Sequence, residues 1–220
     1  MRSRIVCMTI ALMMVGLGGF AFAGPPLVCF PFETNGQPSL PWGGSAWHDS
    51  SPTYDTAKLA RDTVSLLGND VPVLARMETL RRAGIYAAKD TKAGGELLSA
   101  LRTRVKNSSD RKSLAYGFFD LGYFAETYRQ ASLANRQPEP HQIDGYSLVS
   151  KALQDMPNND PEMHFAAALM TLDPKYKKDH ERHLEEAVRG AHEGSLLARN
   201  LVSHFQWRGK DLQSLRASLK

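Results

Sequence analysis

From Ser51 to the C-terminus the sequence keeps a helical period almost without interruption, and this limits the fold more than any other feature. Apolar residues recur at helical spacing, and proline, glycine or asparagine breaks the pattern at short intervals. Short connections make consecutive helices antiparallel. We therefore expect an all-α fold. The predicted helices span residues 52–67, 72–88, 91–106, 111–133, 143–156, 161–172, 177–192 and 195–207, with a short tail helix around 211–218.

The helix over residues 111–133 is expected at the centre of the molecule. Its aromatic side chains point to several faces: Tyr116, Phe118, Phe119, Tyr123, Phe124 and Tyr128. A helix that is apolar around most of its circumference is buried between neighbours. Gly117 and Gly122 would let another backbone approach closely. This helix should therefore carry the packing of the helical body.

The helix over residues 72–88 has a different pattern, with apolar side chains concentrated on one stripe. Glu78 and Arg82 lie four residues apart, which is the spacing at which opposite charges pair on a helix surface. We expect this pair on the solvent-facing side of the helix.

Two stretches resemble the helix pairs of tetratricopeptide-type repeats. The first carries an aromatic residue, a leucine and a glycine in the first helix, then two small apolar residues and a closing proline in the second: Phe118, Leu121, Gly122, Val149, Ala152 and Pro157. The second follows the spacing of the related Sel1-like repeat: Ala191, Gly194, Ala198 and Gly209. The resemblance covers about residues 115–209. It implies antiparallel hairpins stacked as a short α-α superhelix, in families that are mostly binding scaffolds.

The first 23 residues have the features of a signal peptide. Arg2 and Arg4 precede an apolar run, and Ala21-Phe22-Ala23 offers a small-x-small cleavage site. An uncleaved membrane anchor is the alternative, but Gly24-Pro25-Pro26 directly after the site cannot continue a helix. We expect cleavage after Ala23 and a secreted or periplasmic protein with no membrane span after cleavage. The sequence from Gly24 to Cys29, which follows the cleavage site, is similar to the start of some uncharacterised secreted bacterial proteins.

The charge of the remaining chain argues against a polyanionic partner. Removal of residues 1–23 takes away two arginines and no acid, so the formal net charge falls from +4 to +2. No window gathers five or six basic side chains on one face, and we therefore expect no nucleic-acid binding. The length fits one helical domain, residues 53–220, and the hydrophobic content of 42% is enough for a sizeable core.

Residues 24–52 form an irregular segment that differs from everything after it. Six of the twelve prolines lie here together with Trp42 and Trp47, and the prolines forbid a helix. The segment is too apolar for a solvated linker, so we expect it to pack over the helical body. The alternative is an exposed aromatic strip that binds a carbohydrate, a peptide or a membrane surface.

Cys29 is the only cysteine left once residues 1–23 are removed. No intramolecular disulfide can then form, so the thiol is buried, paired with another protein or reactive. Its apolar neighbours Leu27, Val28 and Phe30 favour a sheltered thiol. Ligation of a metal or a haem by Cys29 is not favoured, because no second cysteine is left to act as a ligand.

His180 and His183 are the only closely spaced histidines, three residues apart on a predicted helix. A zincin helix places histidines four residues apart, and that position is Leu184. We therefore expect these histidines at the border of the core, and we predict neither a metal nor a cofactor. If a metal is bound, a third ligand would come from His164, His192 or His204.

No catalytic motif stands out in the sequence. A glycine-framed serine elbow and a phosphate loop are both absent, and Asp120 and Glu126 are expected in ion pairs rather than as a catalytic carboxylate pair. Two interpretations remain. The favoured one is an exported, noncatalytic helical-repeat protein that binds another extracytoplasmic protein or peptide, with Cys29, Trp42 and Trp47 as candidate contacts. The alternative is a small metal-binding protein or enzyme that uses Cys29 or the His180 and His183 pair.

Overall fold

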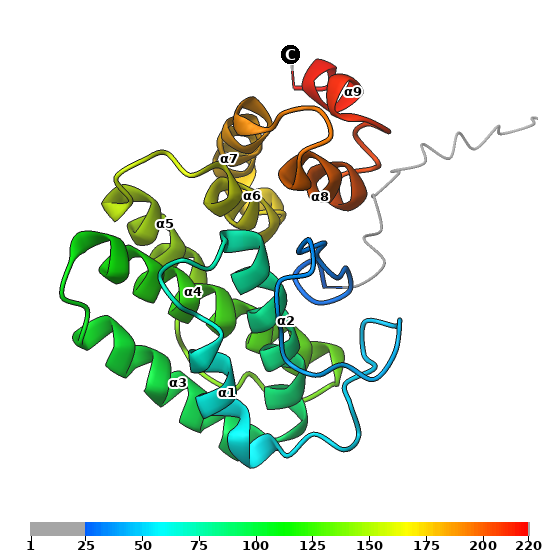
Figure 1. Ribbon diagram of the computed structural model, residues 1–220. Coiled ribbons are helices and arrows are strands. Elements are labelled where there is room, and N and C mark those ends of the chain that lie inside the picture. The colour runs from blue at the N-terminus through cyan, green and yellow to red at the C-terminus, as the bar shows by residue number, and fades with distance from the viewer. Residues whose placement is uncertain (1–24, 220) are drawn as a thin grey trace, which may run out of the picture.

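A computed structural model describes residues 25–219, and this part of the chain is all-α, as the sequence predicts (Figure 1). No strand occurs in it, and the predicted signal peptide over residues 1–23 lies outside it. Two short 3-10 helices, η1 (Thr56–Lys58) and η2 (Pro174–Tyr176), accompany the α-helices. These are α1 (Leu59–Ser65), α2 (Val73–Lys89), α3 (Thr91–Lys106), α4 (Arg111–Ala134), α5 (Gly145–Asp155), α6 (Pro161–Met170), α7 (Lys177–Gly190), α8 (Leu196–His204) and α9 (Leu212–Ala217).

Aspartates fix where most of these helices begin. At five helices an aspartate side chain accepts a hydrogen bond from a first-turn backbone N–H, which satisfies a donor that the helix itself leaves free. These N-caps are Asp90, Asp110, Asp144, Asp160 and Asp211. The first predicted helix starts later than expected, because Asp55 caps η1 and α1 follows only at Leu59.

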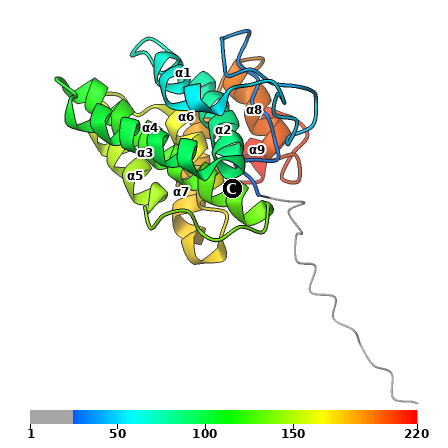
Figure 2. The same cartoon turned by 90° about the horizontal axis from the view of Figure 1, so that it is seen from below.

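Helix α4 is the centre of the molecule and packs against α2, α3 and α5. Figure 2 shows α3, α4 and α5 alongside one another. Gly145 at the start of α5 lies against Gly122, and Arg111 donates a hydrogen bond to the carbonyl of Gln154 at the end of α5, so α4 and α5 are antiparallel. Residues at all faces of α4 are buried, as its aromatic pattern predicts.

Gly122→Ala should destabilise the fold by about 1–3 kcal/mol, because it overpacks the closest approach of α4 and α5. A Cβ at this position would lie 2.6 Å from the carbonyl oxygen of Gly145 and 2.8 Å from the Cβ of Leu148. The same substitution at Gly95, where nothing lies within 4 Å of the added Cβ, is the matched control. Gly95→Ala should stabilise α3 by about 0.5–1 kcal/mol. Urea unfolding of both variants measures the two effects, and equal midpoints would contradict the packing argument.

Helices α6 and α7 form a second antiparallel pair. His180 bonds to the carbonyl of Ala168, His183 contacts His164, and Gly190 lies against Pro161, so the two helices run in opposite directions. Helix α8 follows, and α9 packs on both α7 and α8. Among residues 25–219, no helix combines the length and hydropathy needed to span a bilayer.

The N-terminal segment, residues 25–52, packs between α2 and α8, where Figure 1 shows it in blue. Its apolar side chains Leu27, Val28, Phe32 and Leu40 belong to the main core. Glu33 and Asn200 exchange two hydrogen bonds of 3.0 Å, in which the Asn200 amide pairs with the backbone of Glu33. The predicted packing of this segment over the helical body is confirmed for the described residues.

The second half of this attachment is a buried ionic cluster on α2, made of Glu78, Arg81 and Arg82. Glu78 accepts hydrogen bonds from the backbone N–H of Phe32 at 3.0 Å and from both arginines. Arg81 donates to the carbonyl of Val28 at 2.9 Å. Burial alone would raise the pKa of Glu78, but the hydrogen bonds and charge of Arg81 hold that pKa below its usual range. The predicted Glu78–Arg82 pair therefore exists, but its expected position in solvent is wrong, because Glu78 is only 1% exposed.

A second buried ion pair joins α2 to α4. The Nη1 of Arg76 donates to both oxygens of Asp120, at 3.0 and 2.8 Å. The ring centre of Tyr116 lies 4.0 Å from the guanidinium carbon of Arg76. Its other nitrogens donate to the carbonyls of Val71 and Gly68. The predicted ion pair between Asp120 and another helix is therefore confirmed.

Candidate functional site

The structure places the three candidate contact residues of the N-terminal segment at the edge of the core. Trp42 and Trp47 are partly buried and packed against it, and Arg81 and Arg82 lie 5.1 and 5.5 Å from the Trp42 ring centre. Cys29 is a free, half-buried thiol, and burial raises its pKa although the charge of Arg81 opposes the shift. A raised pKa keeps the thiol protonated, which favours the sheltered interpretation of Cys29 over a reactive one.

The two candidate metal-binding histidines do not face each other. His180 bonds to the carbonyl of Ala168 through Nδ1, whereas the Nδ1 of His183 lies 2.8 Å from the Nδ1 of His164 on α6. Their predicted location at the border of the core is confirmed, since His180 is 5% and His183 1% exposed. Within residues 25–219, no cluster of three or more histidine, cysteine, aspartate or glutamate side chains is placed to hold a metal ion.

His164 and His183 instead form the middle of a hydrogen-bonded network. Asn159 donates to a carboxylate oxygen of Glu186, so its Oδ1 must accept from the Nε2 of His164 at 2.6 Å. Arg182 can only donate, and its guanidinium lies 3.1 Å from the Nε2 of His183, so this ring nitrogen is an acceptor. The hydroxyl of Tyr146 lies 3.0 Å from the same nitrogen. The Nδ1 of His183 therefore carries the proton and donates to the Nδ1 of His164. Both imidazoles are therefore neutral, and each ring nitrogen has a partner.

This network cannot accept a proton without losing a hydrogen bond. A proton added to either imidazole turns an acceptor into a second donor facing a donor. Burial, with the nearby charge of Arg182, lowers the pKa of His183 to about 3. Burial also lowers the pKa of His164. The sequence could not show this pairing, because the two residues lie on different helices.

The first large cavity, which we call the Tyr146 groove, lies where α4, α5, α6 and the N-terminal segment meet. Its volume is about 630 Å³, and its main lining residues are Glu126, Arg129, Leu133, His141, Tyr146 and Tyr176. Leu133 is 48% exposed, and the rings of Tyr146 and Tyr176 lie 5.2 Å apart. Glu126 is ion-paired with Arg129, as the sequence predicts. Sequence reasoning missed this groove, because its lining comes from four separate parts of the chain.

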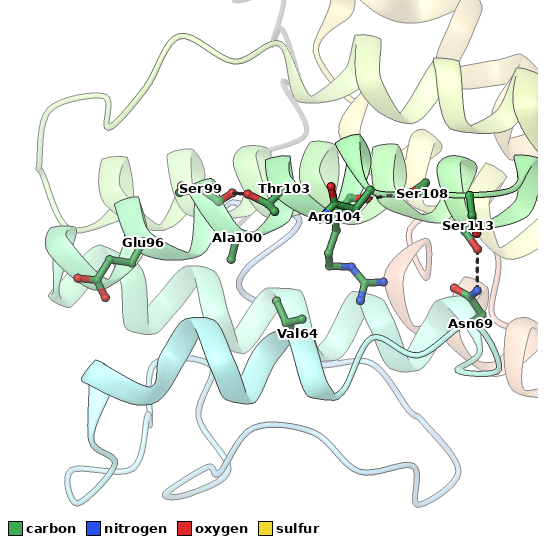
Figure 3. A pocket seen from close by; sticks show the side chains of 11 residues that line it. Val64, Asn69, Glu96, Ser99, Ala100, Thr103, Arg104, Ser108 and Ser113 are labelled. Atoms are coloured by element: carbon green, nitrogen blue, oxygen red, sulfur yellow. Dashed lines mark hydrogen bonds between the residues drawn. The ribbon is translucent and has the colours of Figure 1, made fainter.

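The second cavity, which we call the Arg104 cavity, lies between α1, α3 and the start of α4 and also measures about 630 Å³. Figure 3 shows the Arg104 side chain extending from α3 into the space beside α1, with its guanidinium between Val64 and Asn69. Glu96 lies at the opposite end of α3 in this view. The Asn69 amide donates to Ser113 at 2.7 Å. Most of the side chains that line this cavity carry a hydroxyl or an amide group, whereas the Tyr146 groove is lined by several charged side chains.

No protein-family model matches the chain, and comparison with curated proteins and with solved structures found no significant match. The resemblance to tetratricopeptide and Sel1-like repeats therefore stays a prediction. The function has to be inferred from the two cavities and the side chains that line them.

Proposed function

We propose that the chain is an exported, noncatalytic binding protein that holds a segment of another extracytoplasmic protein or peptide in the Tyr146 groove. The observation that carries the proposal is the exposure of Leu133 beside the paired tyrosines Tyr146 and Tyr176. Exposed large apolar side chains next to a cavity are typical of recognition sites, and tyrosine is enriched in them. A volume of about 630 Å³ lies within the range of ligand pockets.

The charges around the groove favour a basic or neutral segment. Four carboxylates line it, from Glu126, Glu139, Asp144 and Asp173, against the two cations of Arg129 and Lys175. The formal balance of these side chains is therefore −2. Complementary charge speeds association and selects against wrong partners.

Export and a repeat architecture are also parts of the proposal, and both come from the sequence patterns. The signal-peptide pattern supports a secreted or periplasmic location. The antiparallel packing of α4 on α5 and of α6 on α7 is what stacked hairpins would require. The alternative of a metal-binding protein or enzyme predicts stoichiometric metal in the purified protein, which elemental analysis would detect.

Leu133→Asp should weaken capture of the partner at least tenfold, because it replaces the exposed apolar side chain of the groove lining with a charged one. Stability should change by no more than about 0.5 kcal/mol, since Leu133 is exposed. The assay is quantitative pull-down from the native envelope or medium. Lys112→Asp, an exposed position on the first turn of α4 and outside the groove, is the control. Equal capture by both variants would contradict the proposed site.

A further inference from the structure

The charges beneath the Arg104 cavity do not balance. Two guanidinium groups, from Arg76 and Arg104, face the single buried carboxylate of Asp120, which leaves one positive charge. Arg76 takes the close position and bonds both oxygens of Asp120. Arg104 stays 3.6 Å from Asp120 and is the partner that reaches the cavity. The excess charge therefore lies at the cavity wall.

Arg104 also has unused hydrogen-bonding capacity. The Nη2 of Arg104 donates a hydrogen bond to the carbonyl of Leu67 at 2.8 Å, and this bond fixes the direction of the side chain. Its Nε is buried and has no hydrogen-bond partner within residues 25–219. Because the Nε is closed to solvent, a ligand would meet the outer nitrogens of this side chain, which is 27% exposed. A guanidinium that is held in place in this way is suited to bind an oxyanion.

No acidic side chain at the cavity neutralises this charge. Glu96 also lines the cavity, but eight residues separate it from Arg104 on α3, which is about 12 Å along the helix axis. Asp110 caps α4 and is occupied by the backbone and hydroxyl of Ser113. The end of the cavity near Asn69 therefore keeps a net positive charge.

The rest of the lining is suited to a hydroxylated molecule. Seven of the eleven lining side chains carry a hydroxyl or an amide group, including Asn69, Thr103, Ser108 and Ser113. These groups both donate and accept hydrogen bonds, as sugar hydroxyls do. No aromatic side chain lines the cavity, so its binding would depend on polar contacts.

We propose that the Arg104 cavity binds a hydroxylated monocarboxylate of the size of a sugar acid, with its carboxylate on Arg104 and its hydroxyls on the serine, threonine and asparagine side chains. One excess positive charge matches one carboxylate. A phosphate dianion fits less well, because only one excess positive charge is present to meet its two negative charges. This site is separate from the Tyr146 groove, since the two cavities share no lining residue.

The test is a titration of the full ¹⁵N-labelled protein with galacturonate, followed by amide chemical shifts. Three comparison compounds are titrated in the same way. Galactose lacks the carboxylate, acetate lacks the sugar hydroxyls, and inorganic phosphate carries a different negative charge. We expect saturable binding of galacturonate with a Kd on the order of 1 mM, and at least tenfold weaker binding of the other three. Shifts should concentrate on α3 and on residues 107–113. Galactose binding as tight as galacturonate would overturn the proposal.

Arg104→Gln should weaken galacturonate binding at least tenfold, because it removes the charge that pairs with the carboxylate. Arg102→Gln, an exposed arginine on the same helix and outside the cavity, should leave the Kd unchanged. Since Arg104 also contacts Leu67 and Asp120, its loss can affect folding, and Asn69→Ala provides a second variant at an exposed position. Asn69→Ala should weaken binding severalfold. An unchanged Kd in a folded Arg104→Gln or Asn69→Ala variant would contradict the site.

Discussion

Glu78→Gln should lower the free energy of unfolding by about 3–5 kcal/mol, one of the two largest effects we expect. The carboxylate lies between Arg81 and Arg82 and also accepts the backbone N–H of Phe32. Glutamine keeps the size of the side chain but removes the negative charge. Arg81 is only 1% exposed and would then carry an uncompensated buried charge. The buried cluster therefore makes the N-terminal segment part of the folded body rather than an appendage.

Urea unfolding of wild type, Glu78→Gln and Glu193→Gln measures this effect. Glu193 forms an exposed ion pair with Arg216, so its substitution should cost less than about 1 kcal/mol. Limited proteolysis adds an independent readout, because loss of the contact between Glu78 and Phe32 should make residues 25–52 a preferred cleavage region. A Glu78→Gln protein as stable and as protease-resistant as the Glu193→Gln control would show that the cluster does not hold the segment.

Acidification from pH 6.5 to pH 5 should destabilise the fold by roughly 3–4 kcal/mol. Burial and the charge of Arg182 lower the pKa of His183 to about 3, and burial lowers the pKa of His204 to about 4. Unfolded histidine titrates near 6.5, so between these values the unfolded chain binds more protons than the folded one. The contribution of these histidines to the free energy of unfolding is therefore fully present above about pH 6.5. It falls as the pH decreases, by about 1.4 kcal/mol per pH unit for each imidazole.

The measurement is the free energy of unfolding by urea at pH 7, 6, 5 and 4.5. His183→Gln should reduce the slope between pH 6.5 and 5 by about one proton, because one of the two main contributors is gone. The exposed His192 provides the matched control, and His192→Gln should leave the slope unchanged. A wild-type stability that is flat across this range would contradict the neutral, fully paired state of the His164–His183 network.

The helices were predictable because their signals are local. The spacing of apolar residues and the breaks at proline, glycine and asparagine placed most helix boundaries within two residues, including those of α3 and α4. Export and the repeat family stay predictions. What the sequence does not reveal is which helix face meets another segment. Glu78 has the pattern of a solvent-facing residue on α2, but Phe32 covers it from 46 positions earlier in the chain.

The two cavities were also not predictable, because the residues that form them lie far apart in the sequence. Arg104 stands out only when Asp120, sixteen positions later, is found already bonded to Arg76 on α2. The sequence suggested His183 with His180 as a pair, yet the partner of His183 is His164 across the contact between α6 and α7. Long-range pairing of this kind depends on how helices pack, which apolar periodicity alone does not specify.

Site-specific photocrosslinking in the native host tests the central claim, a binding protein that uses the Tyr146 groove, most directly. The full protein would carry a benzophenone amino acid at position 133 or, as a control, at exposed position 102 on α3. We expect a discrete protein adduct from position 133 that is absent from position 102 and is lost when Tyr146→Ala is added. No adduct from position 133, or the same adducts from both positions, would contradict the proposed function.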